Sequence, residues 1–332
     1  MIHTRSLTKD FVLSRAQTVH AVRGVSLHIE PGELVAVLGP NGAGKTTTMR
    51  MLTTLIAPTS GTATVAGHDV VTEPAHVRRH IGYVGQGNGA GHNQRVRDEL
   101  NTQGVIYGLD RRAARQRAGD LLESLDLTEL AARKVSELSG GQRRRLDVAM
   151  GLVHAPSLLF LDEPSTGLDP QNRANLWDHI LRMRAAHNMT IVLTTHYMDE
   201  ADSMAARVVI VDRGEVIADD TAEVLKTKLA GDRIVLTSAA DDAHRLAQLA
   251  ARLPGNRDVV VDGARVEARV ADGPGAVPEL LRVAGEAGVR VTTAQVHRPT
   301  LDDVFLALTG RSLREAENTD DPQDSPFRKD AA

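Results

Sequence analysis

The sequence predicts an α/β protein in which a domain built on a parallel sheet precedes a small α+β domain. Three observations favour this fold class. Short apolar runs alternate with helical segments up to about residue 221, a pattern typical of parallel strands covered on both faces. A new series of strands and helices begins after residue 228. The length of 332 residues also suits two domains, at about 100–200 residues each.

The elements of the first domain follow from their residues. Residues 33–38 form an apolar run, a glycine-rich turn comes next, and residues 45–55 have helical character. The segment 93–140 has little β-branched content and helical periodicity, so we expect a helical insertion there. Further buried strands are predicted at 158–162, 190–194 and 207–211. We expect this domain to span residues 1–228.

The second domain is expected at 229–311. Its predicted order is strand, helix, strand, strand, helix, strand, with a short helix at 301–308 behind it. Asp262-Gly263 is a hairpin signal between the two middle strands. This order is typical of a small ferredoxin-like domain. The polar, acidic tail at 312–332 is predicted to be disordered.

Composition excludes several function classes. The chain has 39 basic and 43 acidic residues, so no general attraction to nucleic acid is expected. The absence of cysteine excludes disulfides, thiolate zinc sites and a cysteine nucleophile. No apolar run approaches the roughly 20 residues that a spanning helix needs, and no signal peptide is expected. We therefore expect a soluble chain whose role at a membrane depends on a partner.

The turn after the first apolar run matches the pattern G-x-x-x-x-G-K-[ST] between a strand and a helix. Backbone N–H groups in such a loop converge on phosphate oxygens, Lys45 is expected to reach the β and γ phosphates, and the Thr46 hydroxyl to ligate Mg²⁺. The expected nucleotide-binding residues here are Gly39, Pro40, Asn41, Gly42, Ala43, Gly44, Lys45, Thr46 and Thr47.

A pair of carboxylates follows the apolar run at 158–162. Ligands of open α/β sheets bind at the carboxyl ends of the strands. We expect Asp162 to hold Mg²⁺ directly or through water, and Glu163 to be the general base for the attacking water. The two motifs together predict a nucleotide hydrolase.

The segment Leu138-Ser139-Gly140-Gly141-Gln142 resembles the signature motif of ABC-transporter ATPases. Gln86, Asp169 and His196 match the Q-loop, D-loop and switch histidine of that family in the expected order. The resemblance implies a head-to-tail homodimer with ATP between the phosphate loop of one protomer and the signature, residues 139–142, of the other. It further implies that Gln86 senses Mg²⁺ and water, that His196 holds the water against the γ-phosphate, and that Asp169 ties the protomers together.

Phe11 occupies the place where this family commonly has an aromatic residue that stacks on adenine. The alternative is a buried phenylalanine at a strand end. An extended stretch from 12 to 20 follows before the family pattern resumes.

The segments 196–202 and 299–310 resemble the daunorubicin-resistance type of exporter ATPase. This resemblance implies a peripheral subunit at the cytoplasmic face of the membrane. It further implies a separately encoded permease and export of a hydrophobic drug, antibiotic or lipid-like compound. The helical insertion follows Gln86 and is expected to receive a permease helix. For the C-terminal domain we favour a role in stabilising the dimer or complex, with a regulatory ligand site as the alternative.

Competing functions stay open at this point. A soluble ABC ATPase acting on nucleic acid or ribosomes usually has two ATPase cores or a long coiled coil, and an importer ATPase usually ends differently. A regulator without turnover is disfavoured because Glu163 and His196 are both present. His76 and His80 have the i, i+4 spacing of a metal pair, but the arginines between them and the missing glutamate argue against a zinc hydrolase site.

Overall fold

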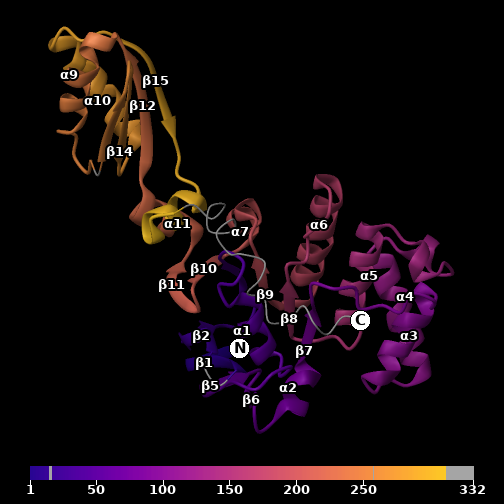
Figure 1. The fold of residues 1–332 in the computed structure, drawn as a ribbon. Coiled ribbons are helices and arrows are strands. Elements are labelled where there is room, and N and C mark those ends of the chain that lie inside the picture. Colours follow the sequence, from indigo (N-terminus) through magenta and orange to yellow (C-terminus); the bar gives the residue numbers. More distant parts are fainter. Residues whose placement is uncertain (15–16, 257, 312–332) are drawn as a thin grey trace. The chain divides into compact units, whose positions relative to one another are not determined.

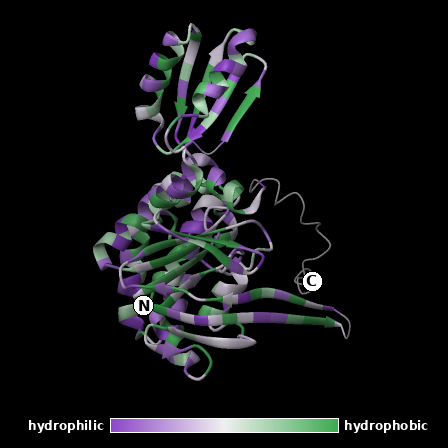
Figure 2. Cartoon of the chain, turned by 90° about the vertical axis from the view of Figure 1, so that its left-hand side faces the viewer, coloured by the Kyte–Doolittle hydropathy of each residue, from purple (hydrophilic) through white to green (hydrophobic). Residues whose placement is uncertain are grey.

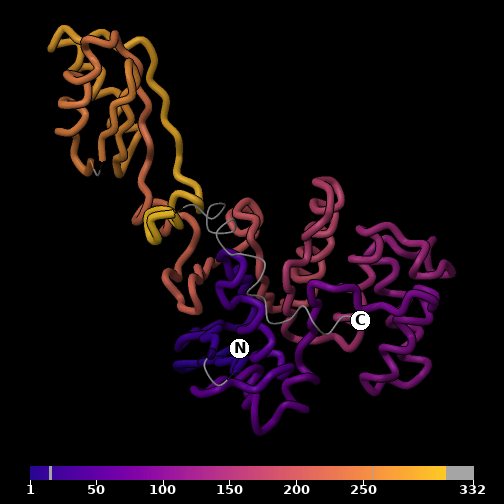
Figure 3. Tube along the Cα trace, in the orientation of Figure 1, coloured from indigo at the N-terminus to yellow at the C-terminus, as the bar shows by residue number. Residues whose placement is uncertain are grey.

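The computed structural model describes residues 1–14, 17–256 and 258–311, so the predicted disordered tail lies outside the described residues. The chain divides into two units, one of residues Met1–Ala218 and one that begins at Asp219 (Figures 1 and 3). The sequence placed this boundary ten residues later, after 228.

The first unit is built on a six-stranded sheet with the order β11-β10-β4-β9-β8-β7. Neighbouring strands from β10 to β7 pair in parallel. Every residue of the central strands β4, β8 and β9 is buried, as the apolar runs predicted. The strands are β4 (Leu34–Leu38), β7 (Ile81–Val84), β8 (Leu158–Asp162), β9 (Thr190–Thr195), β10 (Arg207–Asp212) and β11 (Glu215–Asp220).

Seven α-helices accompany this sheet among the described residues of the first unit. They are α1 (Lys45–Leu52), α2 (Pro74–His80), α3 (Val96–Ile106), α4 (Arg111–Ser124), α5 (Gly140–Leu152), α6 (Pro170–His187) and α7 (Met198–Met204). Helices α3, α4 and α5 pack on one another and form the helical part expected from the sequence (Figure 1). Two 3₁₀ turns, Thr128–Leu130 and Val135–Glu137, connect α4 to α5.

A second, antiparallel sheet was missed by the sequence analysis, which expected only parallel strands here. Its strands are β1 (Ile2–Ser14), β2 (Gln17–Val25), β3 (His28–Ile29), β5 (Ser60–Val65) and β6 (His68–Asp69). They have the order β2-β1-β5-β6, and β3 also pairs with β1. Of the extended stretch noted at 12–20, residues 12–14 belong to β1 and residues 17–20 to β2.

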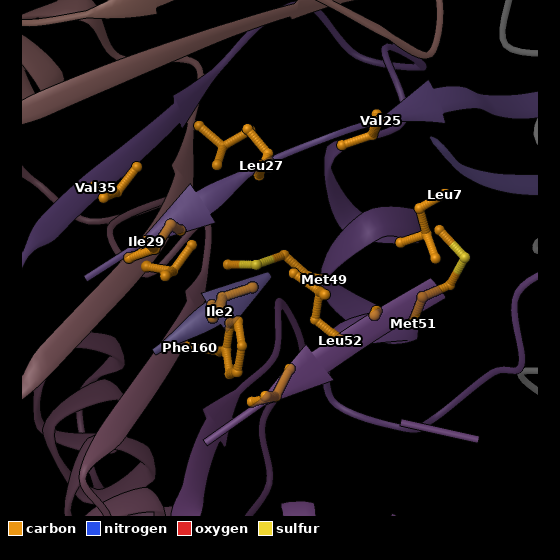
Figure 4. Close-up of a cluster of buried hydrophobic side chains, with 14 of the residues drawn as sticks. Ile2, Leu7, Val25, Leu27, Ile29, Val35, Met49, Met51, Leu52 and Phe160 are labelled. Atoms are coloured by element: carbon orange, nitrogen blue, oxygen red, sulfur yellow. The ribbon is translucent and has the colours of Figure 1, made fainter. Parts of the chain in front are cut away.

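The core of the first unit fills the space between the two sheets and α1. Ile2 from the antiparallel sheet, Met49 from α1 and Phe160 from β8 belong to one buried cluster (Figure 4). Figure 2 shows the apolar residues gathered along the strands. Burial of these side chains, worth about 25 cal/mol per Å², holds α1 and the loop before it against both sheets.

The second unit has the predicted ferredoxin-like order. Its antiparallel sheet runs β13-β14-β12-β15, and α9 and α10 connect the strands. The buried core joins Ile234 and Leu236 of β12 to Leu246 of α9 and Leu280 of α10. The elements are α8 (Ala222–Leu225), a π-helical turn (Lys226–Ala230), β12 (Asp232–Ser238), α9 (Ala240–Ala250), β13 (Asp258–Asp262), β14 (Arg265–Val270), α10 (Gly273–Glu286), β15 (Val291–His297) and α11 (Leu301–Thr309).

Candidate nucleotide site

The loop between β4 and α1 is a tight glycine turn. Gly42 and Gly44 have φ angles of 76° and 97°, in the left-handed region that favours glycine. A Cβ atom at Gly39 would lie 2.2 Å from the carbonyl oxygen of Val211, and one at Gly44 would lie 2.4 Å from that of Ala21. Side chains are therefore excluded at Gly39 and Gly44, where the loop backbone runs against β10 and β2.

Lys45 begins α1, and its side chain turns back over the loop. Its Nζ donates to the carbonyl oxygens of Gly39 at 2.6 Å and Pro40 at 2.8 Å, and the residue is buried. A buried ammonium beside the N-terminus of a helix provides the positive charge and the N–H groups that phosphate oxygens need. The rest of the predicted loop divides into exposed Asn41 and Gly42, buried Pro40 and Ala43, and half-buried Thr46 and Thr47.

Asp162 lies at the end of β8 and is almost completely buried. Its Oδ1 accepts hydrogen bonds from the hydroxyls of Thr46 at 3.0 Å and Thr194 at 2.6 Å, and its Oδ2 accepts one from Tyr83 at 3.5 Å. Gln86 donates from Nε2 to the Thr46 oxygen at 3.4 Å. Residues from α1, β7, β8, β9 and the loop after β7 therefore converge on one point. The structure thus brings together Thr46, Gln86 and Asp162, the three residues expected to bind Mg²⁺.

Glu163 follows Asp162 with a φ of 47°, a left-handed conformation that is uncommon for this residue type. The turn is fixed because the Glu163 N–H donates to the carbonyl oxygen of Thr194 at 3.1 Å and to its hydroxyl at 3.0 Å. The carboxylate lies between two nitrogen atoms: Oε1 is 3.9 Å from Lys45 Nζ, and Oε2 is 3.4 Å from His196 Nδ1. The structure thus brings together three residues predicted from separate motifs.

The pKa of Glu163 is lowered from its usual value near 4.5. Burial acts in the opposite direction and raises the pKa, but the contacts with His196 and Lys45 outweigh it. The carboxylate is therefore ionised at neutral pH and can accept a proton or a hydrogen bond from water.

The signature residues cap α5. The Ser139 hydroxyl accepts from the N–H of Gln142 at 3.3 Å, while the Gln142 side chain accepts from the Ser139 N–H at 2.9 Å. This capping box fixes the start of the helix. Ser139 and Gly140 are exposed residues and lie on elements different from those that hold the phosphate loop.

Asp169 caps α6. Asn172, a residue that the sequence analysis missed, contacts both Asp169 and the signature. The Asn172 side chain donates to Asp169 Oδ2 at 2.5 Å, and the Asn172 N–H donates to Oδ1 at 3.0 Å. A Cβ at Gly141 would lie 2.5 Å from Asn172 Oδ1. The D-loop and the signature are therefore packed together, which accounts for glycine at position 141.

Arg144 was also missed. It is buried on α5 and donates to the carbonyl oxygens of Pro164 at 2.6 Å and Gly85 at 2.7 Å. Its second terminal nitrogen donates to the carbonyl oxygens of Asp162 and Glu163, both at 3.3 Å. One side chain thus links the signature helix to the backbone beside Gln86 and to the carboxylate pair. Its position two residues after Gln142 was the one sequence feature that could have pointed to Arg144.

Phe11 lies on β1, opposite Val19 of β2, and is half-buried. The Lys9 ammonium lies 5.2 Å from the centre of its ring. Its hairpin partner β2 passes the phosphate loop at Ala21. Contact of Phe11 with adenine stays a prediction.

Many nucleotide hydrolases share a phosphate loop and a strand-ending carboxylate pair, but a capped Ser-Gly-Gly-Gln helix start distinguishes the ATPases of ABC transporters. The sequence comparisons agree with the geometry. A family profile described as "ABC transporter" matches residues 22–166, and a profile described as "ATP-binding protein DrrA1-3-like, C-terminal domain" matches residues 221–309. The chain belongs to the ABC transporter family, as an ATP-binding subunit of the daunorubicin-resistance type, and its activity is ATP hydrolysis.

Individual proteins give the same result. The daunorubicin resistance ATP-binding protein DrrA2 of Streptomyces coeruleorubidus is 43% identical over 90% of this chain and 92% of its own. The Nod factor export ATP-binding protein I of Burkholderia pseudomallei is 39% identical over 88% of this chain and 93% of its own. The dimeric structure of MJ0796, a bacterial ABC transporter cassette, is similar with a TM-score of 0.61 and 25% identity, over 67% of this chain and 98% of that chain.

Proposed function

We propose that this chain is the ATP-hydrolysing motor subunit of an exporter and works with a separate membrane permease. Three findings support this proposal. The chain belongs to the ABC transporter family, its C-terminal domain is DrrA-like, and its relatives are named for drug resistance or for export. The proposed cargo is a hydrophobic drug, antibiotic or lipid-like compound, and the proposed location is the cytoplasmic face of the membrane. Among the described residues, no helix is both long and apolar enough to cross a bilayer.

The observation that carries the proposal is the Glu163 carboxylate held between Lys45 and His196. In the proposed mechanism, Lys45 exchanges its contacts with the loop carbonyls for the β and γ phosphates of ATP. Glu163 accepts the proton of the attacking water, and His196 orients that water against the γ-phosphate. The half-buried, strained backbone at Glu163 limits the positions that its carboxylate can adopt.

The residues around Asp162 fit Mg²⁺. This ion takes oxygen ligands in octahedral geometry, and the Thr46 hydroxyl and Asp162 carboxylate oxygens lie 3.0 Å apart. Gln86 lies against the same hydroxyl at 3.4 Å. Bound there, Mg²⁺ would neutralise charge on the β and γ phosphates.

A homodimer completes the proposed site. Ser139 and Gly140 are exposed at the start of α5, where N–H groups suit an anion. We propose that residues 139–142 of one protomer contact the γ-phosphate held by the phosphate loop of its partner. Asp169, fixed by Asn172, would then contact the partner protomer beside the same nucleotide. The head-to-tail arrangement is isologous and gives two equivalent sites.

The permease is proposed to dock on the helical part that follows Gln86. The C-terminal end of α3 exposes Val105, Ile106 and Tyr107, three apolar side chains in a row. The Tyr107 ring stacks on His154 with centroids 3.8 Å apart, and His154 in turn contacts the carbonyl oxygen of Ile81 at the start of β7. Movement at this exposed end would therefore be transmitted through His154 to β7, the strand that leads to Gln86.

Glu163→Gln tests the motor. We expect steady-state ATP hydrolysis by the chain and its permease to fall at least about 100-fold, while ATP affinity stays within about twofold and dimers accumulate with ATP. The matched control is Glu215→Gln, an exposed position on β11. Normal turnover by Glu163→Gln would overturn the assignment of the base. Robust hydrolysis that never responds to a permease or to hydrophobic compounds would overturn the exporter proposal.

A further inference from the structure

Three side chains capable of binding a metal lie together on the edge of the first unit, apart from the nucleotide residues. His68 is on β6, Glu73 immediately precedes α2, and His76 is in its first turn. One ligand atom from each lies within 4.8 Å of those of the other two. The rings of His68 and His76 stack with centroids 5.1 Å apart, and His68 Nδ1 is 3.2 Å from Glu73 Oε1.

The backbone around this cluster is well fixed. Ala66 and Gly67 both have positive φ angles in the tight turn that pairs β5 with β6. Asp69 Oδ1 accepts from the N–H groups of Val71 and Thr72 at 2.9 and 2.8 Å, which closes the loop before α2. Glu73 Oε2 accepts from the Asp69 N–H at 3.2 Å. The three side chains are therefore presented by short, hydrogen-bonded segments.

A third imidazole adjoins the cluster. His80 stacks on His68 with centroids 5.3 Å apart, and its Nδ1 lies 2.9 Å from the carbonyl oxygen of His76. Because a carbonyl oxygen only accepts, Nδ1 is the donor, and the neutral ring keeps its lone pair on Nε2. The intervening Arg78 donates to the Thr54 hydroxyl at 2.9 Å, so its guanidinium is bound by another group.

We propose that His68, Glu73 and His76 form a binding site for a divalent transition-metal ion of the Zn²⁺ class. Two imidazoles and one carboxylate are a common protein ligand set for Zn²⁺, and a water completes the coordination. The site goes beyond the proposed function, because it shares no residue with the nucleotide site and implies no catalysis. A bound ion would join β6 to α2, whose last residue precedes β7 and the loop of Gln86.

The alternative is a surface histidine–carboxylate contact without metal, which would contribute little to stability. Sequence reasoning considered only His76 and His80. The fold adds His68 and Glu73 from outside the helix, and this convergence of three side chains distinguishes the cluster from an ordinary ion pair.

The test is a calorimetric titration of Zn²⁺ into the full, tag-free chain after treatment with chelator, with excess Mg²⁺ present to occupy hard oxygen sites. We expect one equivalent of Zn²⁺ to bind. His76→Asn, an exposed substitution, should weaken that binding by about 100-fold, at the upper end of losses measured for supporting residues of metal sites. Saturating Zn²⁺ should raise the unfolding midpoint of the wild type by about 5 °C and leave that of the variant unchanged.

His28→Asn is the matched control, because His28 also contacts a surface carboxylate, Glu30, at 2.5 Å. It should bind Zn²⁺ as the wild type does. His68→Asn should repeat the loss seen with His76→Asn. Equal affinity in His76→Asn and wild type, or an equal loss in His28→Asn, would mean adventitious binding to scattered histidines and would overturn the site.

Discussion

Arg144 is a single buried cation that organises three motifs. It reaches the carbonyl oxygens of Gly85, Pro164, Asp162 and Glu163 from the signature helix. Burial lowers its pKa, and the nearby Asp147 and Asp162 carboxylates act in the opposite direction. Since a buried charge is tolerated only when it is well partnered, these carbonyl groups and this guanidinium depend on one another.

Arg144→Met should lower the free energy of unfolding by about 2–4 kcal/mol, because buried carbonyl groups lose their donors. It should also reduce ATP turnover more than ATP affinity, because the backbone of Glu163 loses a support. Urea unfolding and steady-state kinetics measure the two effects. The exposed Arg112→Met serves as the control, and unchanged turnover in a stably folded Arg144→Met would contradict the positioning role.

Among individual residues, the site positions that belong to a motif of diagnostic spacing could be predicted from the sequence. Site positions that are defined only by tertiary packing could not. Lys45, Thr46, Asp162 and Glu163 follow from the chemistry of phosphate loops and strand ends, and the structure places them together. Thr194 and Asn172 carry no such pattern. Their roles arise because β9 lies beside β8 and because α5 approaches α6 at Gly141, contacts that no local periodicity encodes.

At the scale of elements, α3 is linked to the catalytic sheet through one aromatic pair. Tyr107 is the C-cap residue that follows α3, and it stacks face to face on His154 with an interplanar angle of 1°. His154 precedes β8, and its Nε2 donates to the carbonyl oxygen of Ile81 at 2.9 Å. Burial lowers the pKa of His154, and the bond to Ile81 offsets this only in part. The folded protein therefore favours the neutral ring.

This pKa direction predicts a pH dependence of stability. The unfolded chain protonates His154 near its usual pKa of about 6.5, whereas the folded chain resists protonation. The free energy of unfolding should therefore fall as pH decreases below about 6.5. His154→Phe keeps an aromatic ring but cannot titrate. Urea unfolding from pH 7 to pH 5 should show a shallower decline in this variant, and parallel curves for both proteins would contradict the prediction.

The largest error of the sequence analysis was also at this scale. The antiparallel sheet escaped because β1 pairs with β5 across more than fifty residues, as in Ile2 with Val65. Its strands are half-exposed: Ile2 and Thr4 are buried, while His3 and Arg5 are exposed. This alternation of buried and exposed residues could have revealed the strands. The prediction relied instead on continuous apolar runs, which detect only strands buried on both faces.

At the scale of the whole molecule, each unit has a hydrophobic cluster of its own. The second unit buries Ile234 and Leu236 with the inner faces of α9 and α10. Its fold was predictable because helix and strand periodicities alternate clearly and Gly263 marks the hairpin with a φ of 56°. Its boundary was less predictable, since β11 and α8 continue the chain without a glycine- or proline-rich linker.

Leu236→Ala should destabilise the second unit by about 2–5 kcal/mol, the usual range for a fully buried leucine, and leave ATP affinity unchanged. Calorimetry should show a thermal transition that moves to lower temperature while an ATP-sensitive transition stays in place. Leu281→Ala, at a partly exposed position on α10, should shift neither. A loss of ATP affinity in Leu236→Ala would show that the two units do not behave independently.

The position of Lys45 has a consequence for how quickly nucleotide binds. Its side chain already has two backbone acceptors, 2.6 and 2.8 Å away. Most of the conformational entropy of a four-carbon chain is therefore lost on folding and need not be lost again in the encounter with phosphate. ATP binding at this loop is then an exchange of hydrogen-bond acceptors by an ammonium that is already in place. An exchange of this kind requires little rearrangement, so association should be limited mainly by diffusion and orientation.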